Sequence, residues 1–225
     1  MATPKAVIVG DSQAQGAGPY LRDRLRDDFG YTVPSPYGKH GAGSVGVLEV
    51  AKAAAVDHPD ADLVVVFSGS VEKNAIAGQG IADLWPDAQI VWYGSAPATK
   101  IVDLSHAKSV FGSHVKDTNY WFTSGEADAR EKRNQQLPAL LPKRIQYMDW
   151  RTLALPNAVA QPSGVSFPNL IDGIHITGAI AKSVFAGTNW PPQGAAGAGG
   201  STQGSSTPLI LAGLIAGLLW FRGRK

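Results

Sequence analysis

The segment Ala6-Val7-Ile8-Val9-Gly10-Asp11-Ser12 runs an uninterrupted apolar stretch into a glycine, an acid and a serine. A short apolar run without polar alternation is typical of a strand in a parallel sheet, because helices cover both faces of such a sheet. Similar runs follow at residues 63–67 and 89–93. The chain therefore predicts a central, mostly parallel sheet that begins with residues 6–9.

Segments with helical spacing of apolar residues separate these strands. Helices are expected at residues 19–29, 45–56, 75–85, 125–141 and 177–185, and two further strands at residues 31–33 and 145–150. Strands that alternate with helices favour an α/β fold with helices on both faces of the sheet. We therefore expect a three-layer αβα sandwich around a mostly parallel, five-stranded sheet.

A second polar cluster lies far along the chain, where Asp172-Gly173-Ile174-His175 places a carboxylate three residues before an imidazole. Residues three apart on a turn that enters a helix lie on the same side. Asp172 is therefore predicted to hold the Nδ1–H of His175 and to leave Nε2 facing Ser12. A serine, a histidine and a carboxylate so arranged are the parts of a serine hydrolase. The alternative is that Asp172 only caps the following helix.

Together, the two motifs resemble those of the SGNH, or GDSL-type, hydrolases. Gly10-Asp11-Ser12 resembles the first block of that family, and Asp172 with His175 resembles its last block. The resemblance covers residues 5–188 and implies an SGNH/flavodoxin-like sandwich. It also implies that Ser12 is the nucleophile, His175 the general base and Asp172 the carboxylate that orients the imidazole.

The middle blocks of the same family match less fully. Gly43, or Gly41 in the other register, takes the place of the second-block glycine. Gly69 takes that of the third-block glycine, but Val71 stands where the family has asparagine. Asn74 lies three residues later. We therefore expect an oxyanion hole made of the backbone N–H groups of Ser12 and Gly43, with Asn74 as a third donor if its loop brings it into reach. The loss of one such donor typically lowers turnover about 10²–10³-fold.

Other polar and aromatic residues near these motifs have simpler expected roles. Asp11 is predicted to position the turn, and Gln13 and Gln15 to be solvated loop residues. The connection formed by residues 94–124 is longer than a simple crossover between a strand and a helix needs. It carries an aromatic cluster at residues 120–122. Long connections are often lids or binding loops. These rings therefore either cover a sugar or an acyl group, or they anchor the connection on the core; both alternatives stay open.

Composition restricts the chemistry further. The chain has 225 residues and no cysteine, and its five histidines show no metal-ligand spacing, so neither a cofactor nor a metal ion is expected. The formal net charge of +2 depends on three basic residues among the last four. Without them, 17 basic residues face 18 acidic ones. A nucleic-acid partner is therefore not expected.

The composition changes abruptly after residue 190. Residues 191–207 are rich in glycine, serine and proline, which predicts a flexible linker. Residues 208–225 form an apolar run with a basic end, which predicts a membrane-anchor helix that meets the bilayer through residues 208–221. Gly213 and Gly217 would let two such helices pack closely and self-associate. The alternative is an apolar tail that docks on a partner protein.

Two functions from different classes follow for a domain at residues 1–190. The first is a membrane-tethered serine esterase, or acylhydrolase, that cleaves an acyl or acetyl ester on a lipid or a cell-envelope glycan. The second is a catalytically weak or inactive SGNH-like binding or structural module of a membrane or virion assembly, which the departure at Val71 keeps open. The tail predicts association with a membrane, either cellular or of a virion, and the sequence does not fix the side of that membrane.

Overall fold

The computed structural model describes residues 2–69, 74–149, 159–161, 164–166, 170–176, 181–182 and 185. Val71, the linker at 191–207 and the apolar tail at 208–225 with its two glycines lie outside the described residues, as does most of the helix expected at 177–185. Among the helices that are described, none combines the length and the apolarity needed to cross a bilayer.

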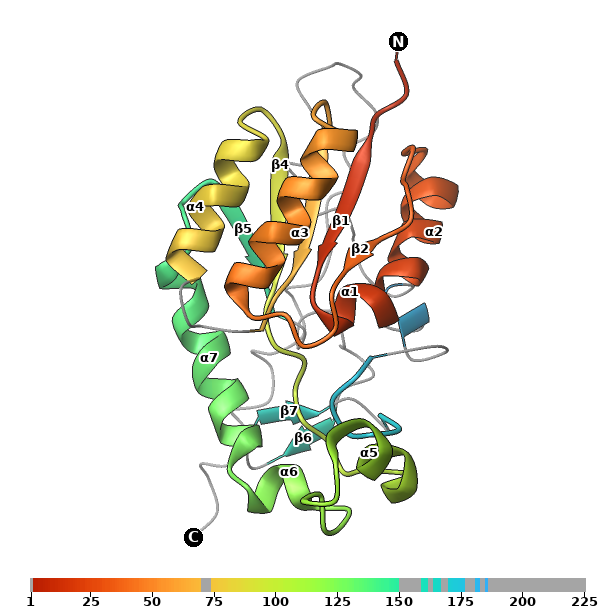
Figure 1. Cartoon of the computed structure of the whole chain (residues 1–225), viewed down its shortest axis with the longest axis vertical. Helices are drawn as coiled ribbons and strands as arrows, with labels where there is room; N and C mark the ends of the chain where they lie inside the picture. The colour runs from red at the N-terminus through yellow and green to blue at the C-terminus, as the bar shows by residue number, and fades with distance from the viewer. Residues whose placement is uncertain are drawn as a thin grey trace, which may run out of the picture.

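A five-stranded parallel sheet forms the centre of the fold (Figure 1), in the order β2-β1-β3-β4-β5. Each neighbouring pair of strands is parallel, which confirms the predicted α/β class. The strands are β1 (Ala6–Gly10), β2 (Tyr37–Gly38), β3 (Leu63–Phe67), β4 (Gln89–Tyr93) and β5 (Ile145–Met148).

Helices follow the strands along the chain. They are α1 (Ser12–Gly16), α2 (Gly18–Phe29), α3 (Ser44–Asp57), α4 (Asn74–Leu84), α5 (Leu104–Phe111), α6 (Tyr120–Thr123) and α7 (Glu126–Leu140). Of these, α2, α3 and α4 pack on the sheet. A separate antiparallel pair consists of β6 (Val159–Gln161) and β7 (Gly164–Ser166). In Figure 1, β1 points down toward α1, so the carboxyl ends of the parallel strands lie at the lower end of the sheet, beside α1.

The two faces of the sheet are buried against different helices. Ile8 points toward α2 and packs in one core cluster with Leu21 and Leu25 of that helix. Val7 and Val9 point to the opposite face, where α3 and α4 cover them. Every residue of β1 and β3 is fully buried, because alternate side chains enter these two cores. This explains why both strands are apolar without alternation, and it confirms the predicted three layers.

The second strand was predicted in the wrong place. Residues 31–33 contribute only an isolated bridge between Thr32 and Lys5, whereas β2 pairs with the end of β1 four residues later. Pro34 and Pro36 lie between the two positions, and a proline has no N–H to give to a ladder. The prolines therefore confine β2 to two residues at the edge of the sheet.

Candidate active site

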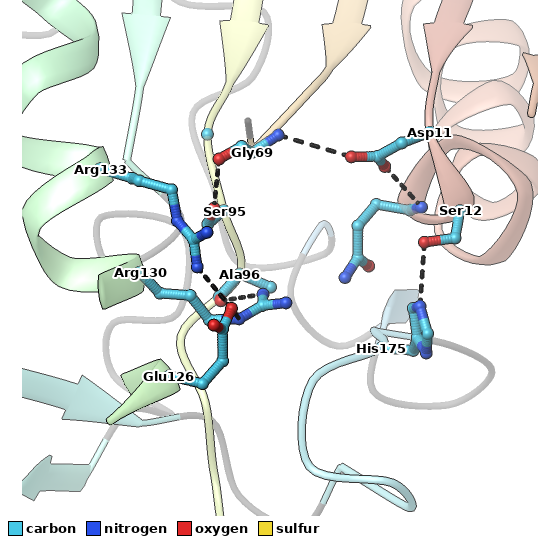
Figure 2. A pocket seen from close by; sticks show the side chains of 11 residues that line it. Asp11, Ser12, Gly69, Ser95, Ala96, Glu126, Arg130, Arg133 and His175 are labelled. Carbon is cyan, nitrogen blue, oxygen red and sulfur yellow. Dashed lines mark hydrogen bonds and ion pairs between the residues drawn. The ribbon is translucent and has the colours of Figure 1, made fainter. Parts of the chain in front are cut away.

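The turn after β1 places Ser12 at the carboxyl end of the sheet. The backbone at Gly10 lies so close to β3 that a Cβ there would stand 2.3 Å from the carbonyl oxygen of Phe67, so only glycine fits. Asp11 follows and caps α1, because its Oδ1 accepts the N–H of Gln13 at 2.8 Å. Ser12 is then the first residue of α1, with its side chain toward His175 (Figure 2).

The turn that carries His175 is built around Asp172. The carboxylate of Asp172 accepts the backbone N–H groups of Ile174 at 3.1 Å and His175 at 2.9 Å, and its Oδ2 lies 2.7 Å from His175 Nδ1. Gly173 has a φ of +86°, and a Cβ there would stand 2.7 Å from the carbonyl oxygen of Thr99. Tight backbone packing and three hydrogen bonds to one carboxylate therefore fix the direction of the imidazole.

The structure brings the two motifs together, although 163 residues separate Ser12 from His175. Ser12 Oγ lies 2.9 Å from His175 Nε2, and Asp172 is bound to the other ring nitrogen. With Asp172 on Nδ1–H, Nε2 is free to accept the proton of the serine hydroxyl. The alternative role of Asp172 as a mere helix cap leaves this side-chain contact unexplained.

The charge of Asp172 is stabilised by its neighbours. Burial alone would raise the pKa of this carboxyl, but the hydrogen bonds from the His175 side chain and from the backbone of His175 and Ile174 outweigh it and lower the pKa below its ordinary value. Asp172 is only 3% exposed, and its lowered pKa keeps it ionised at neutral pH despite this burial. A buried carboxylate at this position can stabilise an imidazolium on His175.

Gln13 fixes the histidine turn from the side of α1, and the sequence analysis missed this role. Its side chain is buried rather than solvated; Nε2 donates to the carbonyl of Ile174 at 2.7 Å, and Oε1 accepts the N–H of Ile176 at 3.1 Å. The two partners flank His175 on either side. Gln13 therefore ties the residue next to Ser12 to the backbone that carries His175.

We expect Gln13→Leu to lower kcat for ester hydrolysis about 10–100-fold, because the histidine turn loses both bonds and the imidazole shifts from Ser12. The unpaired groups should also lower the free energy of unfolding by about 1–3 kcal/mol. Gln79→Leu is a matched control, since exposed Gln79 bonds only to Asp83 within the described residues. Steady-state kinetics with denaturant unfolding would test this, and an unchanged kcat would contradict the positioning role.

The connection at residues 94–124 supports the histidine turn rather than lying loose above it. Trp121 is buried, and its indole Nε1 donates to the carbonyl of Asp172 at 2.7 Å. The ring of Phe111 in α5 stacks on the imidazole of His175, with centroids 5.5 Å apart and planes 8° apart. Of the two alternatives for the aromatic cluster, Trp121 therefore fits the anchoring one.

The predicted oxyanion donors differ in whether they line the two cavities beside Ser12. Ser12 lines both cavities at the site, whereas Gly43 caps α3 and lines neither of them. Asn74 begins α4, and its side chain lies outside the described residues. Gly69 does line one of these cavities, and its N–H points to Oδ2 of Asp11 at 3.4 Å. Ser12, Gly43 and Asn74 thus stay predictions as donors.

Asp11 has the positioning role that the sequence predicts. It joins α1 to the loop after β3 through its bonds with Gln13 and Gly69. Burial raises the pKa of this carboxyl above its ordinary value, against the opposing influence of those two bonds and of the charges on Arg130 and His175.

Two cavities border the pair formed by Ser12 and His175. The smaller measures about 200 Å³ and is largely polar (Figure 2); it is lined by Asp11, Ser12, Gln13, Gly69, Gly94, Ser95, Ala96, Glu126, Arg130, Arg133 and His175. The larger measures about 390 Å³ and is mostly apolar; it is lined by Ser12, Gln15, Gly16, His40, His106, Val110, Ile171, Asp172 and His175. An ester bound at Ser12 can therefore place its two halves in two different environments.

No metal site competes with this interpretation in the part of the chain that the structure describes. Among those residues, no group of three or more histidines and carboxylates is placed to hold an ion. His40 and His106 border the larger cavity, and the rings of His40 and His175 lie 5.8 Å apart. These imidazoles are available as polar contacts for a ligand.

Comparison with known proteins gives similarity only among solved structures, because no protein-family model and no curated protein matches the chain. The periplasmic domain of a lipopolysaccharide acetyltransferase from Salmonella ser. Paratyphi A is 14% identical, with a TM-score of 0.49 and coverage of 82% of both chains. The C-terminal catalytic domain of Streptococcus pneumoniae peptidoglycan O-acetyltransferase A is 16% identical, with a TM-score of 0.43 and coverage of 83% of this chain and 90% of the other. A lipase from a goat rumen metagenome is 12% identical, with a TM-score of 0.49 and coverage of 82% and 95%.

The chain resembles the SGNH hydrolases in its first and last motifs and has the α/β fold that this resemblance implies. The likeness to the solved structures is distant, so the reaction is inferred from the chain's own site residues.

Proposed function

We propose that the chain is a serine ester hydrolase in which Ser12 is the nucleophile, His175 the general base and acid, and Asp172 the carboxylate that orients the imidazole. The observation that carries this proposal is the continuous pair of hydrogen bonds, 2.9 Å from Ser12 to His175 and 2.7 Å from His175 to Asp172. Nucleophile, base and orienting group within hydrogen-bond reach are the signature of an activated serine.

The reaction follows from this geometry in two stages. Ser12 Oγ attacks the carbonyl carbon of the ester while its proton passes to His175 Nε2, and the resulting oxyanion faces the backbone N–H of Ser12. The tetrahedral intermediate then expels the alcohol, which takes the proton from His175. Water attacks the acyl-serine with the same histidine as base, and the carboxylic acid leaves.

The size of the smaller cavity favours a short acyl group. We place the acyl half in this cavity, whose volume of about 200 Å³ suits an acetyl or similarly small group, and the alcohol half in the mostly apolar cavity of about 390 Å³. An acetyl or short acyl ester on a glycan or a lipid headgroup is therefore the proposed substrate class. Anchorage in a membrane through residues 208–221 stays a prediction of the sequence.

We expect the full-length chain to hydrolyse 4-nitrophenyl acetate and butyrate at least about tenfold faster, in kcat/KM, than the octanoate, because only the shorter acyl groups fit the cavity. Release of 4-nitrophenolate measures the rate, and Ser12→Ala supplies the background. A chain that binds such esters without turning them over would instead support the non-catalytic binding module.

A further inference from the structure

The end of the smaller cavity opposite Ser12 is cationic. Arg130 and Arg133 project from the same side of α7, and Glu126 lies one turn earlier in that helix. Figure 2 shows these three side chains facing Ser12 and His175 across the cavity. A substrate held by Ser12 therefore has two guanidinium groups within the same small space.

One carboxylate serves both arginines. Glu126 Oε1 accepts from Arg130 Nε at 3.1 Å and also from Arg133 Nη2. Asp11 lines the same cavity and its charge acts on Arg130, but the hydrogen bonds that its oxygens accept within the described residues come from two backbone N–H groups. Within the described residues, Glu126 is thus the one carboxylate that hydrogen-bonds to these two guanidinium groups.

The two arginines differ in how far their donors are used. Arg130 also donates to the carbonyl of Ala96 at 2.9 Å and so holds the loop that follows β4 in place. Arg133 makes one hydrogen bond within the described residues, and its buried Nε has no partner there. A guanidinium has five N–H donors, so most of those on Arg133 are available.

We propose that this cavity binds a carboxylate carried by the ester substrate, with Arg133 as the main contact. A planar guanidinium matches the two oxygens of a carboxylate, and such charge-assisted bonds are strong where water is scarce. Turnover of an anionic ester rests on the proposed hydrolase function, whereas binding of the carboxylate does not. The proposed function puts the acyl half in this cavity, so the charge is expected on the acyl half; a charge on the alcohol half is the alternative that the experiment separates.

Two pairs of esters test the proposal with the full-length chain. For the acyl half, 4-nitrophenyl hydrogen fumarate is compared with its methyl ester; the trans double bond keeps the carboxylate from attacking its own ester. For the alcohol half, 4-acetoxybenzoate is compared with methyl 4-acetoxybenzoate. We expect the charged member of one pair to exceed its neutral partner at least about tenfold in kcat/KM.

The same ratio is then measured in variants. Arg133→Gln should lower it about tenfold or more, and Arg133→Lys should give an intermediate ratio, because an ammonium keeps the charge without the planar pair of donors. Arg26→Gln is the control, since Arg26 pairs with aspartates on the outer surface of α2. Circular dichroism verifies that each variant is folded.

The failures of the two proposals are distinguishable. Ratios near one in both pairs, unchanged by Arg133→Gln while neutral esters are still turned over through Ser12, would overturn the anion site and leave the hydrolase intact. If no ester is turned over, binding of monomethyl fumarate by calorimetry decides the matter. Binding that Arg133→Gln weakens about tenfold supports the site, and equal or absent binding refutes it.

Discussion

Ser12→Ala and His175→Ala are each expected to lower kcat/KM for 4-nitrophenyl acetate by about a thousandfold or more. Without the Ser12 hydroxyl, no acyl-serine can form. Without the imidazole, Ser12 loses the base whose Nε2 lies 2.9 Å from Oγ and accepts its proton. Both losses should fall mainly on kcat, because neither side chain is needed to hold the ester before attack. Ser109→Ala, which removes an exposed hydroxyl bonded to a backbone carbonyl, should leave the rate unchanged.

The double variant of Ser12 and His175 gives the sharper result. Residues that act in one proton transfer are not additive, so the double variant should be little worse than either single variant. Losses that multiply would mean that the two side chains act independently, despite the hydrogen bond between them.

Asp172→Asn is expected to lower kcat about 10²–10⁴-fold with little change in KM. An asparagine fills the same space but can donate to His175 Nδ1, which favours the tautomer with the proton on Nε2 and removes the acceptor that Ser12 needs. Asp117→Asn is the control, because exposed Asp117 likewise accepts a backbone N–H two residues along. A rate for Asp172→Asn within threefold of the parent would show that this carboxylate does not orient the base.

The same substitution predicts a pH-dependent change in stability. The pKa of Asp172 is lower in the folded chain than its ordinary value of about 3.9, so the ionised carboxylate stabilises the fold above that pH. This contribution is lost as the pH falls through the folded pKa. The difference in unfolding free energy between parent and Asp172→Asn should therefore be present at pH 7 and shrink below about pH 4.

The central strands were predictable because burial on both faces leaves a plain signature in the sequence. The runs that became β1 and β3 are apolar throughout, and β4 is apolar after Gln89 at its start. The edge strand was not predictable in this way. Its two residues, 37–38, are held only by pairing with β1, and the apolar run at 31–33 offered a stronger local pattern.

The serine, histidine and aspartate were identifiable because their motifs are short and local, each within four residues. Gln13, Arg130 and Arg133 were not, since what they do depends on contacts with distant segments. A glutamine beside a serine is usually solvated, and only the fold shows that Gln13 hydrogen-bonds to the backbone on both sides of His175. The arginines of α7 likewise look like the charged surface of a helix until the fold turns them into the cavity.

The site at which phenylmethylsulfonyl fluoride attaches to the full-length chain tests the role of Ser12 most directly. An activated serine forms an Oγ–S bond and releases fluoride, with His175 taking the hydroxyl proton. Peptide mass spectrometry should find a single adduct on Ser12, its extent matching the loss of ester hydrolysis, and no adduct in Ser12→Ala. Hydrolysis that persists in Ser12→Ala, or inactivation that accompanies an adduct on another residue, would contradict the assignment of Ser12 as the nucleophile.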